Sequence, residues 1–199
     1  MSVAERICTS PREHIRNVAL CLFVEQGFQA VSLRQLASAV GMQAGSLYNH
    51  FESKQALLFE LIESYETELL HALPTFKPLG ADPLKALGIF VRAHLHFTLR
   101  QDQRARLTRM EFRCLEQEQQ VRIQHLRAVC SQRLTAILHH GIERQVFKPV
   151  PVNTLVPCLL SLLNDAGNWF GPHLSMTAAV ELQMKMISGA LLPTAGAPN

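Results

Sequence analysis

The sequence predicts an all-α protein of about nine helices. Apolar residues recur three and four positions apart through most of the chain, which is the spacing of an amphipathic helix. Runs that alternate apolar and polar residues between turn signals, as strands do, are nearly absent. A hydrophobic content of 48% over 199 residues is enough to build a substantial core.

The first helices are marked by their caps. Ser10 to Glu13 has the residues of a capping box with Pro11 at the first helical position, and Gly27 is expected to end this helix in a left-handed conformation. Ser32 and Gln35 predict a second capping box, and the helix that it opens should end at Gly41. A short third helix is expected over about 43–50 and a fourth from about 53.

The remaining helices follow a segment rich in proline and glycine, residues 74–82. We expect them at about 83–100, 104–115, 119–144, 152–170 and 175–191. The chain then divides into an N-terminal domain at 1–53, a connecting helix and linker at 54–80, and a helical domain at 81–199.

Residues 33–47 form the most informative unit. Two helices that cross steeply after a turn of three or four residues approach closely, so a small side chain is needed at Ala37, and the turn favours a glycine such as Gly41. Leu47 would anchor the second helix and leave its other face free. That face is polar and aromatic without an acidic residue, so it can approach phosphates and base edges. A purely structural helical hairpin is the alternative.

The N-terminal region also resembles a known family. The runs 27–37, 41–42, 45–51 and 53–57 are similar to the DNA-binding domain of TetR-type (tetracycline-repressor-like) regulators, over about residues 10–60 without a gap. The resemblance implies an all-helical homodimer with an N-terminal three-helix helix-turn-helix domain and a C-terminal domain for effector binding and dimerisation. Most members of the family are repressors that a small ligand releases from DNA.

The resemblance assigns roles to individual residues of the N-terminal domain. Tyr48, His50 and Lys54 would contact phosphates. Ser32 and Ser46 would contact phosphate or cap a helix, and Arg34 would either reach phosphate or remain a solvated surface charge. The residues expected to face bases are Gln43, Ala44 and Asn49, since amide side chains suit adenine and a methyl group suits thymine.

The C-terminal domain carries a weaker resemblance. Residues 109–115, with Arg122 and Arg127, are similar to a subset of the family whose ligands are often acyl-CoA thioesters or other lipid-like metabolites. The expected effector-binding residues are Phe90, His94, Phe97, Arg109, Phe112, Arg113 and Trp169. Most of these residues have a structural alternative: the phenylalanines as core, His94 as a surface or satisfied interior group, Arg113 as an exposed charge, and Trp169 as part of a dimer interface built by the last two helices. The neighbouring Glu111 is likewise expected to be an exposed charge.

Other function classes are disfavoured. The histidine pairs 94/96 and 139/140 do not share a helix face, and five cysteines without C-x-x-C spacing do not suggest zinc, so we expect no metal site. No nucleophile and base arrangement, phosphate loop or dinucleotide motif is present, so we expect no catalytic residues and no cofactor. No apolar run reaches the length of a membrane span and no signal peptide is recognisable, which predicts a cytoplasmic protein without a membrane partner.

The sequence therefore favours a transcriptional regulator. It would be a homodimeric repressor, released from a palindromic double-stranded DNA operator by a small apolar or acyl-type effector such as an acyl-CoA. A ligand-independent activator or architectural DNA-binding protein, and a protein-interaction module, remain as alternatives. The net charge of +3 permits a nucleic-acid partner without demanding one.

Overall fold

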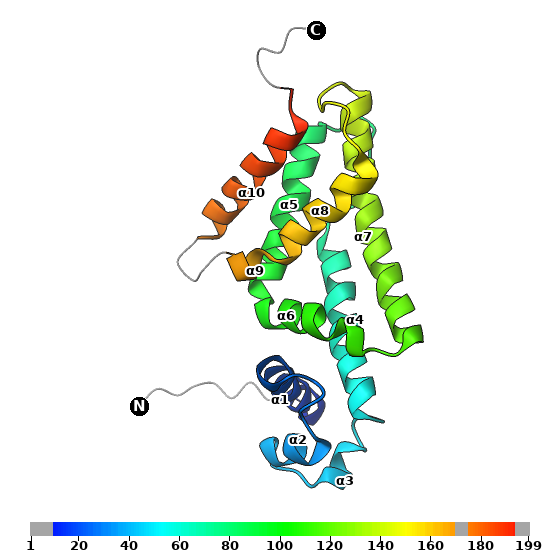
Figure 1. Ribbon diagram of the computed structural model, residues 1–199, viewed down its shortest axis with the longest axis vertical. Helices are drawn as coiled ribbons and strands as arrows, with labels where there is room; N and C mark the ends of the chain where they lie inside the picture. Colours follow the sequence, from blue (N-terminus) through cyan, green and yellow to red (C-terminus); the bar gives the residue numbers. More distant parts are fainter. Residues whose placement is uncertain (1–9, 170–174, 194–199) are drawn as a thin grey trace. The chain divides into compact units, whose positions relative to one another are not determined.

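The computed structural model describes residues 10–169 and 175–193, and every regular element in those ranges is helical (Figure 1). The α-helices are α1 (Pro11–Gln26), α2 (Leu33–Ala39), α3 (Ala44–Leu47), α4 (Lys54–Ala72), α5 (Pro83–Arg100), α6 (Asp102–Glu111), α7 (Gln117–Glu143), α8 (Val152–Asn164), α9 (Ala166–Trp169) and α10 (Met176–Leu191). A 3₁₀ turn, η1 (Phe112–Cys114), follows α6. The expected all-α fold is confirmed.

The described residues contain ten α-helices where nine were expected, because the single helix predicted at 152–170 is two helices. α8 ends at Asn164 with Asp165 as its cap residue, and the four-residue α9 starts at Ala166. Phe170, where that helix was expected to end, lies outside the described residues.

The helix starts follow the residues that cap them. Ser10 forms the predicted capping box, since its hydroxyl accepts from the Glu13 amide while the Glu13 carboxylate accepts from the Ser10 amide, both at 3.2 Å. Asp82 caps α5 by accepting from the amides of Leu84 and Lys85. Gly27 ends α1 with the expected positive φ of 86°, but its ψ of 145° lies outside the left-handed helical region.

The helices fall into two compact units. The N-terminal unit contains residues 1–65 and 103–121, and the C-terminal unit contains residues 66–102 and 122–199. Helices α4 and α7 each contribute residues to both units. Residues 103–121 were expected in the C-terminal domain, but they pack with the N-terminal helices.

Each unit has its own apolar core. In the N-terminal unit the fully buried side chains include Ile15, Phe23, Leu36, Leu57 and Leu58. In the C-terminal unit α5 packs against α8, α9 and α10 (Figure 1). The buried side chains of the C-terminal unit include Leu87, Phe90, Ile123, Leu138, Phe147 and Leu163. No described helix combines the length and the hydropathy needed to cross a bilayer.

Candidate nucleic-acid interface

Helix α2 begins at a serine cap. The Ser32 hydroxyl accepts from the Gln35 amide at 3.2 Å, so Ser32 takes the capping role that the sequence left open beside a phosphate contact. Only this half of the predicted capping box is recorded for α2, and the Nε2 of the Gln35 side chain donates to Oε1 of Gln26 at 2.6 Å. This bond joins α2 to the end of α1.

The turn after α2 depends on one glycine. Gly41 has φ 70°, its amide donates to the Ser38 carbonyl at 3.2 Å, and the Met42 amide donates to the Ala37 carbonyl at 2.9 Å. These two bonds are those of a Schellman motif, in which the residue after the helix must be left-handed. An added Cβ at Gly41 would meet nothing within 4 Å, so backbone conformation alone requires glycine here.

The two helices of the unit pack as the residue sizes predict. Ala37 on α2 is 2% exposed and Leu47 on α3 is 3% exposed, which confirms both as interior residues. Helix α3 is shorter than the predicted 43–50, because Tyr48 to His50 form a turn in which the His50 amide donates to the Leu47 carbonyl at 2.9 Å. The turn carries the chain toward α4.

The predicted DNA-contacting side chains of residues 32–50 are all at least partly exposed. Tyr48 is 58% exposed, and Ser32, Arg34, Gln43 and Asn49 are also exposed. Ala44, Ser46 and His50 are partly exposed. No Asp or Glu occurs from residue 26 to residue 51, so no carboxylate within this segment opposes a phosphate.

Lys54 has a structural role beside the predicted phosphate contact. Its Nζ donates to the carbonyls of Phe28 and Val31, both at 2.8 Å, and lies 4.2 Å from the centre of the Phe28 ring. Burial lowers the pKa of Lys54, and the nearby Cys114 and Glu111 act in the opposite direction. A phosphate contact therefore has only the third Nζ donor available.

Glu111 is a residue whose place sequence reasoning missed. It was expected to be an exposed charge, but it is 7% exposed and its Oε1 accepts from the Phe28 amide at 3.1 Å. Arg113 is exposed, as its structural alternative predicted. The apolar neighbours Leu107 and Leu115 were the available sequence signal that this segment is buried.

The predicted effector-binding residues divide between the two units. Phe90, His94, Phe97 and Trp169 belong to the C-terminal unit, whereas Arg109, Phe112 and Arg113 belong to the N-terminal unit. Within the first group Phe90 and His94 are buried, Phe97 is partly exposed and Trp169 is 55% exposed.

His94 is a buried neutral histidine. It is 1% exposed, and burial lowers its pKa to about 4. Its Nδ1 lies 3.3 Å from the Thr98 hydroxyl, while its Nε2 has no hydrogen-bond partner among the described residues. Gln183 of α10 is similar: Nε2 donates to the Leu162 carbonyl at 3.1 Å, and Oε1 has no described partner. Among the described residues no group of His, Cys, Asp and Glu is placed to hold a metal ion.

Two family models match this chain along most of its length. Residues 15–61 match the bacterial regulatory proteins of the tetR family, and residues 80–187 match the tetracyclin repressor-like C-terminal domain. The chain belongs to the TetR family. It is therefore a DNA-binding transcriptional regulator, as the helix-turn-helix predicted.

Individual TetR-family proteins agree with this assignment. The transcriptional repressor KstR2 of Mycobacterium tuberculosis is 27% identical over 179 residues, which cover 85% of this chain and 86% of the relative. The crystal structure of the TetR-family regulator PfmR from Thermus thermophilus has a TM-score of 0.76 and 32% identity, covering 89% of this chain and 96% of PfmR. The structure of AibR in complex with isovaleryl coenzyme A and operator DNA has a TM-score of 0.78 at 18% identity, covering 89% and 97%, so it supports the fold.

Proposed function

We propose that this TetR-family regulator is a homodimeric repressor that binds a pseudo-palindromic operator and leaves it when a small acyl-type effector binds. The observation that carries the DNA-binding part is the segment from α2 to the turn after α3, which has no acidic residue and whose predicted contact residues are exposed or partly exposed. The base-reading residues in this proposal are Gln43, Ala44 and Asn49, and the phosphate-contacting residues are Tyr48, His50, Lys54 and Arg34. Repression is supported by KstR2, a relative named as a repressor.

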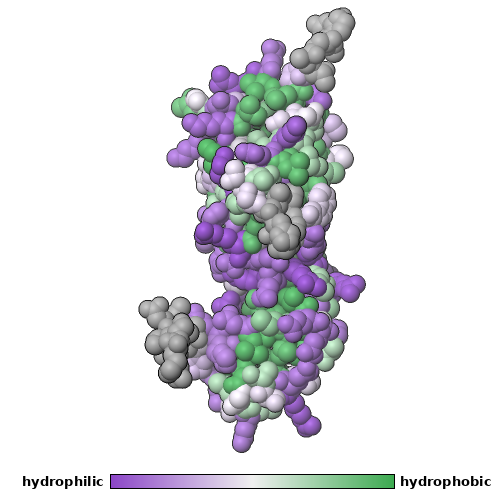
Figure 2. Space-filling model, turned by 90° about the vertical axis from the view of Figure 1, so that its left-hand side faces the viewer, coloured by the Kyte–Doolittle hydropathy of each residue, from purple (hydrophilic) through white to green (hydrophobic). Residues whose placement is uncertain are grey.

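The proposed dimer interface is formed by α8 and α10. On α10 the apolar side chains of Leu182 and Met186 are 46% and 49% exposed, and on α8 Cys158 is exposed. Figure 2 looks onto the side of the C-terminal unit that carries α10 and shows apolar residues among polar ones there. Such side chains on two neighbouring helices suit a partner that repeats the same surface about a twofold axis. Trp169, which is 55% exposed on α9, is a further interface residue in this proposal.

The proposed effector site lies in the C-terminal unit and includes Phe90, His94 and Phe97 of α5. Buried polar atoms are nearly always hydrogen-bonded, so the unpartnered Nε2 of His94 suits a ligand or a water molecule. Since burial keeps the His94 ring neutral at pH 7, a neutral carbonyl, ester or thioester suits it better than a free charge. AibR, which was solved with isovaleryl coenzyme A, supports the acyl class.

A footprinting experiment tests the DNA-binding proposal. Two recognition units related by a dyad should protect half-sites about one helical turn apart, or a multiple of that, in a sequence with dyad symmetry. The double variant Leu182→Glu/Met186→Glu should be monomeric and lose this footprint. Leu79→Glu, at a fully exposed linker position, should remain dimeric. A monomeric wild-type protein, or a footprint without dyad symmetry, would contradict the proposal.

A thermal-shift screen tests the effector proposal separately. An acyl-CoA present at 100 times its dissociation constant should stabilise the protein by about 2.7 kcal/mol, and it should release the operator. His94→Leu should lower the affinity for that ligand. The affinity of the ligand-free protein for the operator should not change. If acyl-CoAs and free fatty acids neither stabilise the protein nor release DNA, the regulator acts without such a ligand.

A further inference from the structure

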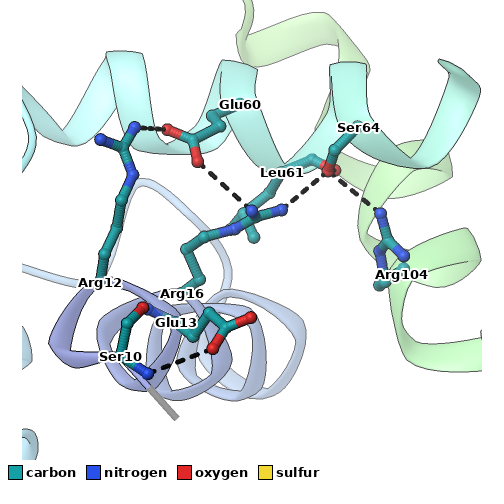
Figure 3. Close-up of polar contacts among 8 residues, drawn as sticks. All are labelled: Ser10, Arg12, Glu13, Arg16, Glu60, Leu61, Ser64 and Arg104. Atoms are coloured by element: carbon teal, nitrogen blue, oxygen red, sulfur yellow. Dashed lines mark hydrogen bonds and ion pairs between the residues drawn. The ribbon is translucent and has the colours of Figure 1, made fainter. Parts of the chain in front are cut away.

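Near its first residues, helix α6 is hydrogen-bonded to another helix of the N-terminal unit. Figure 3 shows the guanidinium groups of Arg16 from α1 and Arg104 from α6 converging on the Ser64 hydroxyl of α4, each with Nη2 at 3.0 Å. The same hydroxyl donates to the Leu61 carbonyl at 3.1 Å. Ser64 thereby uses its one donor and both acceptor positions, and it joins three helices at one atom.

The other end of α6 reaches the loop between α1 and α2. Glu111 is the last residue of α6, and its two carboxylate oxygens have different partners. Oε1 accepts from the buried Phe28 amide at 3.1 Å, and Oε2 accepts from the Cys114 thiol at 3.2 Å. A Cβ at Gly27 would lie 3.7 Å from Oε1, so the carboxylate sits directly against the backbone at this point.

The same loop is held from α4 by a cation. Lys54 Nζ donates to the carbonyl of Phe28, whose amide donates to Glu111, so both polar groups of one residue's backbone are bound by opposite charges from two helices. Lys54 also binds the Val31 carbonyl, immediately before the Ser32 cap of α2. The loop is therefore bound by two charged side chains directly before the Ser32 cap of α2.

We infer that Glu111 is a positioning residue for operator recognition. Its carboxylate fixes the Phe28 amide opposite Lys54, and this fixes the start of α2 and with it the α2–α3 unit that reads DNA. The inference rests on the DNA-binding function of the family and is independent of the proposed effector. A buried amide that loses its acceptor costs free energy unless the backbone moves to find another partner, and such a movement would displace α2.

Three variants, each of which removes one negative charge, test this inference. Glu111→Met keeps the length of the side chain without an acceptor, and Glu111→Gln keeps one carbonyl acceptor for the Phe28 amide. Glu116→Gln changes an exposed carboxylate in the same unit and controls for charge. Affinity is measured on operator and on random-sequence DNA, with thermal unfolding and hydrogen exchange of the Phe28 amide recorded in parallel.

We expect E111M to weaken operator binding about tenfold or more, with less than about threefold change on random DNA and faster exchange at Phe28. E111Q and E116Q should stay within about threefold of wild type on both DNAs. An E111M protein that is folded and binds operator normally would overturn the inference, as would equal losses on both DNAs. If E111M does not fold, E111Q decides, because an E111Q protein that loses operator binding with an intact fold contradicts a role for the acceptor. A wild-type protein that binds no operator would instead contradict the proposed function.

Discussion

Arg127 of α7 donates through Nε to Oε1 of Glu66 on α4 at 2.6 Å, and Glu66 is only 7% exposed. Burial raises the pKa of Glu66, while the charge and the hydrogen bond of Arg127 lower it. Arg127 belongs to the basic residues that the sequence resemblance connected with a ligand. In the C-terminal unit it instead neutralises a buried carboxylate.

Removing one partner of this ion pair should cost more than removing both. Arg127→Met leaves Glu66 buried without its guanidinium and should lower the free energy of unfolding by about 2–3 kcal/mol, less than for a fully buried pair because the Arg127 side chain is 40% exposed. The double variant Arg127→Met/Glu66→Met should recover much of that loss, since neither charge remains. Urea unfolding at one protein concentration measures both. A double variant less stable than the single one would contradict this account.

His94 should make stability depend on pH. The unfolded side chain takes up a proton near pH 6.5, whereas the folded one does so only near pH 4, so protons favour the unfolded state as the pH falls through this window. Between pH 7.5 and pH 5 the free energy of unfolding of the wild type should fall by about 2 kcal/mol because of His94. The His94→Gln variant should not show this loss. His96→Gln, exposed on the same helix, should follow the wild type. Parallel curves for wild type and H94Q would contradict the assignment.

Gly141 should tolerate no side chain. A Cβ built at Gly141 in α7 would overlap the ring of Phe147, which is itself only 2% exposed. Gly141→Ala should therefore destabilise by about 1–2 kcal/mol, although alanine favours a helix. Gly88→Ala is the matched control in α5, where the added methyl group meets only Met184 at 3.7 Å, and it should be neutral or stabilising. Urea unfolding measures both variants.

Lys54 should affect both stability and DNA binding. Lys54→Met removes the two carbonyl contacts to Phe28 and Val31 and should lower the melting temperature. If the third Nζ donor contacts a phosphate, as we propose, the slope of log affinity against log salt should also fall by about 1. Lys77→Met removes the same charge from an exposed linker position and should change neither quantity. A destabilised K54M with an unchanged slope would leave Lys54 a purely structural role.

Gln43 should read a base. Gln43→Ala should weaken binding to the correct operator by about 1–3 kcal/mol and relax the preference at one base pair. The reason is that a side-chain amide that forms bidentate hydrogen bonds with one base edge distinguishes that base from the others. Gln124→Ala changes an exposed glutamine of α7 in the same way and should leave the specificity intact. Titrations with operators mutated at single positions measure the change. If Gln43→Ala weakens binding to operator and to random DNA equally, Gln43 contacts the DNA backbone and not a base.

The recognition unit could be predicted from the sequence because its determinants are local. A glycine after α2, a small residue at Ala37 and an apolar anchor at Leu47 lie within fifteen residues, and the predicted glycine turn is present as a Schellman motif. The helix starts at Ser10 and Asp82 could also be predicted from the sequence, since an N-cap depends only on residues close to it in the chain.

Tertiary structure decided what depends on distant residues. Glu111 lies 83 positions from Phe28, and Arg127 lies 61 positions from Glu66, so no spacing rule could pair them. Whether a charge is solvated or buried depends on which helices pack around it. For Glu111 this is fixed only when α6 folds with the N-terminal unit, and for Glu66 only when α7 packs beside α4. The sequence by itself therefore determined the class of regulator and the helix-turn-helix segment that we propose reads DNA, while the fold decided which charged residues contact the loop before that segment.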